Sequence, residues 1–213
     1  NKYDVSLIDV TQNCEKLITN LLSFKPDVVF NCLHGFFGED GQVQSILNYL
    51  KIPYTHSGVL ASSIAMNKVI SKFFYNAVNV SHPKTINMAE IDTNFKGPII
   101  IKPICGGSSK GLYKIENSDQ LRKFKEENNA QISNFFVEEF IEGRELTVGI
   151  LDNKICGIME MTYDSNLYDF DSKYVNIAKH ILNPKIPVEI ENKLKETSLK
   201  IHKTLNCNCI SRL

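Results

Sequence analysis

The strongest chemical signal in this sequence is an apolar run that delivers a lysine and is followed by a loop of small residues. The run is residues 100–103 (IIKP), which includes Lys102, and the loop is residues 106–111 (GGSSKG), which includes Ser108 and Ser109. Glycines let backbone N–H groups approach an anion closely, while hydroxyl groups and lysines add donors and positive charge. This combination suits the phosphates of a nucleotide. An ordinary hairpin turn has a similar composition, so the loop alone leaves both interpretations open.

Two familiar nucleotide-binding motifs are missing from the sequence. Neither G-x-x-x-x-G-K-[ST] nor G-x-G-x-x-G occurs in it. The first marks a P-loop and the second a dinucleotide-binding fold. Both folds are therefore disfavoured, and any ATP must be held in another way.

Charge and composition exclude several classes of protein. The 213 residues contain 24 Lys and Arg against 24 Asp and Glu, so no bulk field attracts nucleic acid or an anionic membrane. No apolar run approaches the ~20 residues that span a bilayer, and no secretion signal is visible. We therefore expect a cytoplasmic protein with no nucleic-acid or membrane partner. The six cysteines lack CxxC spacing and should be reduced; Cys207 and Cys209 could share a metal, but two packing residues are the favoured interpretation.

The elements that must position these residues fall into three groups. Residues 27–33 predict a strand and residues 42–51 a helix, so the loop between them (HGFFGEDG, residues 34–41) is a site candidate at the end of a strand. Residues 62–79 predict one helix with Lys68 and Lys72 on the same face.

From residue 98 the apolar pattern has period two. It predicts strands at 99–102, 112–115, 135–141 and 146–151, with a short charged helix at 118–128 between them. Residues 188–205 predict a last helix, and a final strand follows it. The fold class is thus α/β and α+β, and we expect three lobes at 1–62, 63–140 and 141–213.

Five motifs in order give this chain a close resemblance to the D-alanine:D-alanine ligases. They are residues 34–41, 66–68 (MNK), 99–111, 137–151 (VEEFIEGRELTVGIL) and 167–174 (LYDFDSKY). The resemblance runs from about Val28 to Arg212. It implies an ATP-grasp fold, in which two α+β lobes close on ATP, preceded by an α/β N-terminal lobe.

The resemblance also implies roles for single residues at the nucleotide. It assigns the phosphates to Lys68 and Lys102, adenine to the segment with Glu138, Glu139 and Ile141, and the ribose to Glu145; the hydroxyl of Ser109 adds a donor to the phosphate loop. Without the resemblance, the acidic residues at 138, 139 and 142 indicate a solvated strand edge instead.

For the reaction itself, the resemblance implies a second set of residues. Ser108 would position the second substrate, Lys173 would reach the terminal phosphate, Tyr174 would help close the site, and Arg212 would stabilise the tetrahedral intermediate. His34 would lie near the substrates, although a structural histidine is an equally good interpretation of a single His after a strand.

The chain departs from the family's pattern at several points. Asn67 stands where the family usually has Asp, and Gly106 where it usually has Glu. The family's carboxylates for Mg²⁺ (or Mn²⁺) would follow Arg212, so we expect the metal ligands beyond this chain, which we interpret as incomplete at both ends. At most an altered affinity is expected from Asn67 and Gly106, because the lysines and serines remain.

The implied reaction is ATP-dependent ligation of two D-alanines to D-alanyl-D-alanine, through an acyl phosphate, for peptidoglycan synthesis. We expect a homodimer. A D-alanine:D-lactate or D-alanine:D-serine ligase would carry the same nucleotide motifs, although the Lys173-Tyr174 pair resembles the dipeptide ligases. A ligand-binding fragment without activity is the third alternative.

Overall fold

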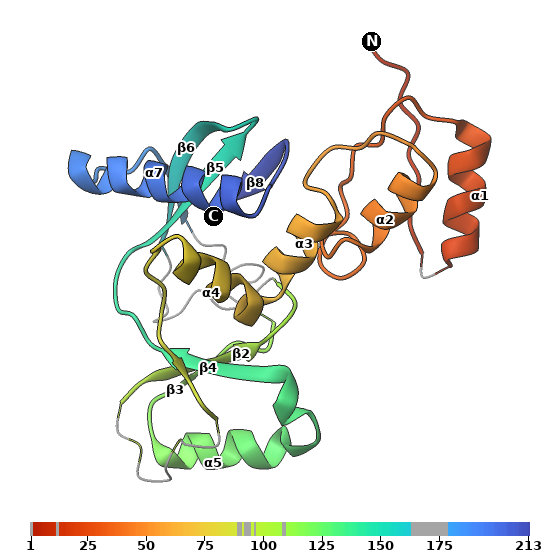
Figure 1. Ribbon diagram of the computed structural model, residues 1–213. Helices are drawn as coiled ribbons and strands as arrows, with labels where there is room; N and C mark the ends of the chain where they lie inside the picture. The colour runs from red at the N-terminus through yellow and green to blue at the C-terminus, as the bar shows by residue number, and fades with distance from the viewer. Residues whose placement is uncertain are drawn as a thin grey trace.

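The structure is a computed structural model that describes residues 2–11, 13–88, 91, 95, 97–107, 110–162 and 179–213. Three bodies surround a central helix, α4 (Lys68–Ala77) (Figure 1). The N-terminal helices lie to one side of α4, one four-stranded sheet lies below it and the other above it in this view.

The N-terminal body contains three helices, and the first two pack around a small apolar core with Leu17, Leu21, Val43 and Leu47 at its centre. The three helices are α1 (Cys14–Phe24), α2 (Gln42–Tyr49) and α3 (Val59–Met66). The helix predicted at 42–51 is thus confirmed, whereas the strand predicted at 27–33 is wrong. Only Val29 pairs there, in a single parallel bridge to Tyr54. A strand needs a neighbour for its row of N–H and C=O groups, and one bridge does not supply that.

The prediction of a single helix at 62–79 is wrong in one respect, because this segment forms parts of two helices, α3 and α4. Asn67 adopts an extended conformation between α3 and α4, and its side chain accepts hydrogen bonds from the N–H groups of Val69 (3.2 Å) and Ile70 (3.0 Å). Asparagine is among the best N-cap residues, since its short side chain satisfies N–H groups that have no partner within the helix. Asn67 therefore ends one helix and begins the next.

Replacing Asn67 with alanine should lower the free energy of unfolding by about 1 kcal/mol, because α4 loses its cap. Asn67→Asp should keep the stability, since a carboxylate accepts the same bonds and suits a helix N-terminus. Urea denaturation of both variants beside the wild type measures this. Equal losses in the two variants would contradict the capping role.

The central sheet has the strand order β1-β4-β2-β3 and is antiparallel throughout. Its strands are β1 (Thr85–Ile86), β2 (Ile99–Pro103), β3 (Tyr113–Ile115) and β4 (Phe135–Glu139). Helix α5 (Ser118–Glu127), capped by Asn117, and the 3-10 helix η1 (Asn129–Asn134) join β3 to β4. The predicted strands at 99–102, 112–115 and 135–141 and the helix at 118–128 are confirmed, within a few residues at their ends.

The apolar core of the central sheet lies on one face only, so polar side chains can occupy the other face. Ile99, Ile101 and Val137 pack with Leu121 and Phe124 of α5. Because side chains alternate along a strand, the residues between them point to the opposite face, where α4 lies. That face carries Lys102 and Glu138.

The C-terminal sheet has the strand order β7-β6-β5-β8, also antiparallel. Its strands are β5 (Glu145–Leu151), β6 (Lys154–Thr162), β7 (Lys179–Leu182) and β8 (Ile210–Arg212), and α7 (Val188–Thr204) packs against it. The strand predicted at 146–151, the helix at 188–205 and the final strand are confirmed. The sequence did not reveal α1, β1, β6 or β7.

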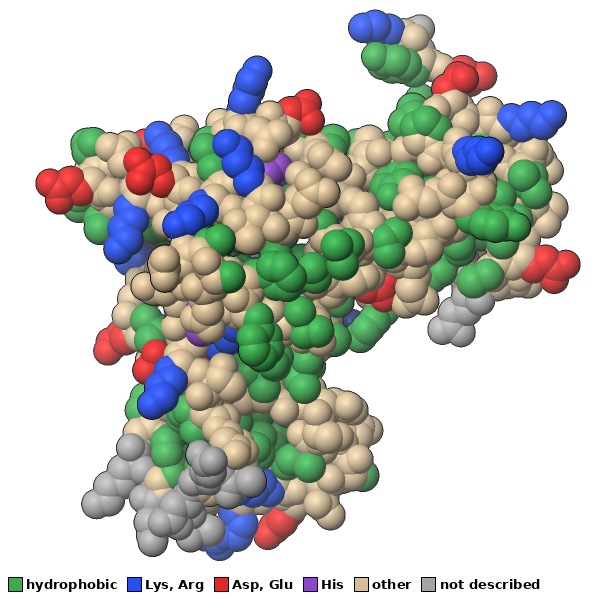
Figure 2. Space-filling model, in the orientation of Figure 1, with side chains coloured by type: hydrophobic (Ala, Val, Ile, Leu, Met, Phe, Trp, Pro, Cys, Tyr) green, Lys and Arg blue, Asp and Glu red, His purple; other side chains and the backbone are tan. Residues whose placement is uncertain are grey.

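Apolar side chains gather over α3 and α4 on the face that Figure 2 shows. Leu60, Ile70 and Phe73 of these helices are exposed. Among the described residues, no helix is both long and apolar enough to cross a membrane.

Candidate functional site

A cluster of charged side chains lies between α4 and the central sheet. Lys102 of β2 pairs across the sheet with Phe136 of β4, and Ile100 with Glu138, so alternation brings Lys102, Phe136 and Glu138 to the face opposite α5. Lys72 reaches the same place from α4. The site is thus built by two strands and one helix.

Glu138 lies at the centre of this cluster and is only 4% exposed. One carboxylate oxygen is 2.8 Å from the Lys72 ammonium, and the other contacts the Lys102 ammonium. The Phe136 ring lies beside both cations, with its centroid 5.2 Å from the Lys72 nitrogen and 5.5 Å from that of Lys102. A solvated edge at Glu138, the interpretation from its residue type alone, is therefore wrong: two cations allow the carboxylate to be buried.

Lys68 connects this cluster to the glycine-rich loop. Its backbone N–H donates to the carbonyl of Ile104 (2.9 Å), and its ammonium donates to the carbonyls of Pro103 (3.1 Å) and Gly106 (2.7 Å). Burial, and secondly the charge of Lys102, lower the pKa of Lys68 below its usual value. A lysine that is partly removed from water beside a second cation is well suited to receive an anion.

Gly106 lies close to the first candidate loop and has a backbone conformation that favours glycine. Its φ is +109°, which side-chain-bearing residues rarely adopt, and a Cβ there would be 3.9 Å from the Phe36 ring of the HGFFGEDG loop. Glycine, in place of the glutamate that the family usually has here, is therefore compatible with the backbone conformation. Two motifs far apart in the sequence are neighbours in the fold.

The segment that the resemblance assigns to adenine lies where the chain crosses between the two sheets (Figure 1). Glu139 is exposed and accepts a hydrogen bond from the N–H of Lys84 (2.8 Å). Ile141 is 60% exposed, which leaves an apolar surface open beside the crossing. Glu145 is half-buried at the start of β5.

An ion pair that the sequence analysis missed fixes the start of β5. Arg144 donates to both carboxylate oxygens of Glu160 on β6 (2.6 and 2.7 Å) and to the carbonyl of Lys185 (3.2 Å). Hydrogen bonds with Arg144 hold the pKa of Glu160 below its usual value. This bidentate pair orients the residue next to Glu145. Arg144 precedes β5, and Glu160 lies on a strand that the sequence did not reveal, so no local signal indicated the contact.

His34 and Arg212, two residues that the resemblance assigns to the reaction, are both exposed. His34 is exposed, with its Nδ1 4.0 Å from a carboxylate oxygen of Glu39. Arg212 is exposed on β8, paired through its backbone with Gly149 of β5. Beside it, the Ser211 hydroxyl lies 2.7 Å from Nδ1 of the buried His202, whose pKa burial lowers. Both predicted residues are accessible.

Four predicted residues, Ser108, Ser109, Lys173 and Tyr174, lie outside the described residues. All six cysteines are free thiols. The described part of the chain contains no group of three or more His, Cys, Asp or Glu placed to share a metal, and this includes the surroundings of Cys207 and Cys209.

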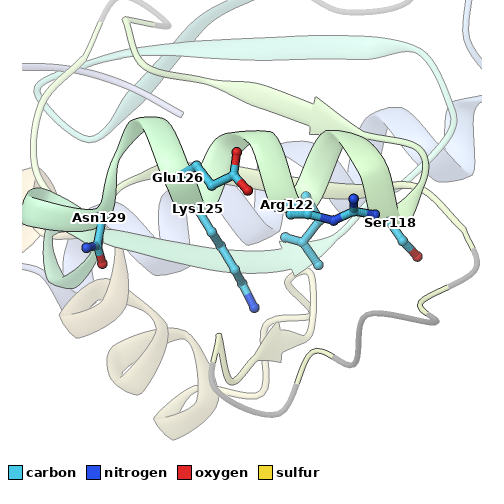
Figure 3. A pocket seen from close by; sticks show the side chains of 6 residues that line it. Ser118, Arg122, Lys125, Glu126 and Asn129 are labelled. Carbon is cyan, nitrogen blue, oxygen red and sulfur yellow. The ribbon is translucent and has the colours of Figure 1, made fainter.

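A cavity among the described residues lies away from this cluster. Its volume is about 460 Å³, and it lies along α5 between Ser118 and Asn129 (Figure 3). Because α5 covers the face of the sheet opposite Lys102 and Glu138, the sheet separates this cavity from the lysine cluster. We do not assign the nucleotide to it.

Two sequence families match the chain over nearly all its length. The family described as D-ala D-ala ligase N-terminus matches residues 2–57, and that described as D-ala D-ala ligase C-terminus matches residues 60–213. The D-alanine–D-alanine ligase of Pelagibacter ubique is 39% identical, over 100% of this chain and 72% of its own length. That of Rhodospirillum rubrum is 37% identical, over 99% and 71%.

Solved structures agree with the sequence matches. A Bacillus anthracis D-alanine–D-alanine ligase complexed with ATP aligns with a TM-score of 0.74 at 28% identity, over 92% of this chain and 66% of its own. The VanG D-Ala:D-Ser ligase of Enterococcus faecalis aligns with a TM-score of 0.73 at 30% identity, over 87% of this chain and 58% of its own.

Proposed function

The chain belongs to the D-alanine–D-alanine ligase family and has its ATP-grasp fold, and from this premise we propose that the protein joins two D-alanines at the expense of ATP. The product would be D-alanyl-D-alanine, for peptidoglycan. The chain spans 66% of the length of the ATP-bound Bacillus anthracis ligase.

The observation that carries the proposal is the pair of lysines at the glycine-rich loop. An ammonium group has three donors. Lys68 gives two of them to the carbonyls of Pro103 and Gly106, and among the described residues Lys102 donates only to Glu138. Both therefore keep donors for an anion, beside a loop whose backbone can approach phosphates.

The chemistry we propose is positioning and charge stabilisation. Phosphoryl transfer to the carboxylate of one D-alanine concentrates negative charge, which Lys68 and Lys102 would neutralise from one side of the cleft. The amine of the second D-alanine then attacks the acyl phosphate, and phosphate leaves. The exposed Ile141 would cover the adenine ring, and Glu145 would accept hydrogen bonds from the ribose.

A divalent cation would add counter-charge to the same phosphates. The described residues contain no cluster of three or more His, Cys, Asp or Glu that could hold one. Our proposal of Mg²⁺ rests on the family alone.

The activity predicts phosphate release that depends on D-alanine. Incubating the protein with ATP, Mg²⁺ and D-alanine should release phosphate and form the dipeptide, whereas L-alanine should give neither. D-Alanine paired with D-serine or D-lactate should be a poorer substrate combination than D-alanine alone. Activity confined to a mixed pair would contradict the proposed substrate, and the absence of nucleotide binding would contradict the site.

The D-alanine:D-serine ligase remains the second candidate because the VanG structure superposes nearly as well as the ATP-bound ligase. The two activities differ at the second substrate, so the mixed-pair reactions of the same assay separate them.

A homodimer and a cytoplasmic location are also proposals. The exposed apolar side chains of Leu60, Ile70 and Phe73 offer a surface for a second copy (Figure 2). Sedimentation velocity of the protein and fractionation of its cells test the two proposals. We also propose that the chain divides into three lobes, at residues 1–62, 63–140 and 141–213.

A further inference from the structure

Lys72 is the most deeply buried cation of the cleft, and the proposed reaction does not use it. It lies on α4 one turn after Lys68 and is 8% exposed. Its ammonium donates to the carbonyl of Pro83 (2.8 Å), the hydroxyl of Thr85 (2.9 Å) and a carboxylate oxygen of Glu138 (2.8 Å). A buried ammonium with three protein acceptors needs an explanation, since burying a charge is costly.

The donor count separates Lys72 from its two neighbours. All three donors of Lys72 are taken by protein atoms, so it has none left for a phosphate. Lys68 and Lys102 have fewer acceptors than donors within the described part of the chain. Lys72 is therefore not a third phosphate ligand, although it lies on the same helix face as Lys68.

The charge balance shows what Lys72 does instead. Three ammonium groups and one carboxylate meet in the cleft, so the described side chains leave a net charge of +2. Without Lys72, both oxygens of Glu138 would be opposed only by Lys102, and the net charge would be +1. Fewer positive charges would then face the phosphates.

We propose that Lys72 is a positioning residue for the nucleotide: by neutralising Glu138, it keeps the charges of Lys68 and Lys102 available to the phosphates of ATP. This inference rests on the proposed ATP site. It also gives Glu138 a role in holding Lys102, in place of a role as a freely available acceptor for adenine.

The test compares variants that change the charge of the cleft in known steps. Lys72→Met lowers the net charge to +1 at similar side-chain size, and Lys72→Met/Glu138→Gln restores it to +2. Lys72→Arg keeps the charge, and Lys123→Met removes an exposed lysine on the far helix α5 as a matched control. Calorimetric titration with ATP and with adenosine separates effects on the phosphates from effects on the rest of the nucleotide.

We expect Lys72→Met to raise the Kd for ATP on the order of tenfold and the Kd for adenosine by less than about twofold. Lys72→Arg and Lys123→Met should stay near the wild type, and the double variant should recover most of the lost ATP affinity. An unchanged ATP affinity in a folded Lys72→Met variant, or equal losses for ATP and adenosine, would overturn the inference.

The double variant keeps the test decisive if Lys72→Met does not fold. ATP binding within about threefold of the wild type in the double variant supports the inference, and a loss beyond about tenfold overturns it. Failure of the wild type itself to bind ATP would instead refute the proposed function, so the two outcomes are distinguishable.

Discussion

Replacing Lys102 with alanine should weaken ATP binding by more than about 2 kcal/mol, as expected for a removed charge-assisted hydrogen bond in a partly desolvated cleft. The ammonium of Lys102 is held by Glu138 against the Phe136 ring, so it is already placed and little ordering remains when the phosphates arrive. D-Alanine binding should change far less, because the amino acid carries no phosphate.

Separate calorimetric titrations with ATP and D-alanine measure the two affinities of the Lys102→Ala variant. Lys123→Ala is its control, since Lys123 is exposed on α5 and only 3.8 Å from Glu127 in a surface ion pair. A folded Lys102→Ala variant with the nucleotide affinity of the wild type would show that Lys102 is a structural partner of Glu138 and nothing more.

Replacing Glu138 with alanine should lower the free energy of unfolding by about 3–5 kcal/mol, the range for breaking a buried ion pair. The change leaves Lys72, which is 8% exposed, without its counter-ion beside Lys102. It also removes one of the links between α4 and the central sheet, because Glu138 of β4 contacts Lys72 of α4 and Lys102 of β2.

Urea denaturation followed by circular dichroism measures this stability, with Glu127→Ala on α5 as the control. Glu127 belongs to an exposed ion pair, for which a change of about 0–1 kcal/mol is expected. If Glu138→Ala cost no more than Glu127→Ala, the carboxylate would not be the centre of the cleft.

Local patterns predicted β2, which carries Lys102, and several of the elements around it. The period-two runs gave β2, β4 and β5 to within a few residues, and the helical spacing of apolar residues gave α5 and α7. These patterns are reliable because each element buries one face, so apolar residues recur along its sequence with the period of a helix or a strand. The order of five motifs then indicated the family, which the sequence and structure matches confirm.

Other elements could not be predicted because their causes are not local. The strand expected at 27–33 has the right composition but only one paired residue. The helix expected at 62–79 divides at Asn67, where an asparagine in the middle of a helical pattern acts as a cap. Whether such a residue interrupts a helix depends on what the chain packs against on either side.

The sequence by itself determined the family, most strands of the two sheets and the choice of Lys68 and Lys102 as the lysines that we propose for the nucleotide. The tertiary structure alone decided that Glu138 is a buried counter-ion, because its partner Lys72 is 66 positions away. The cost of burying a carboxylate depends on the charges around it, and those come from a helix and a strand distant in the sequence. Residue type could therefore indicate only a solvated edge at Glu138, whereas packing α4 against the sheet made the same residue the centre of the site.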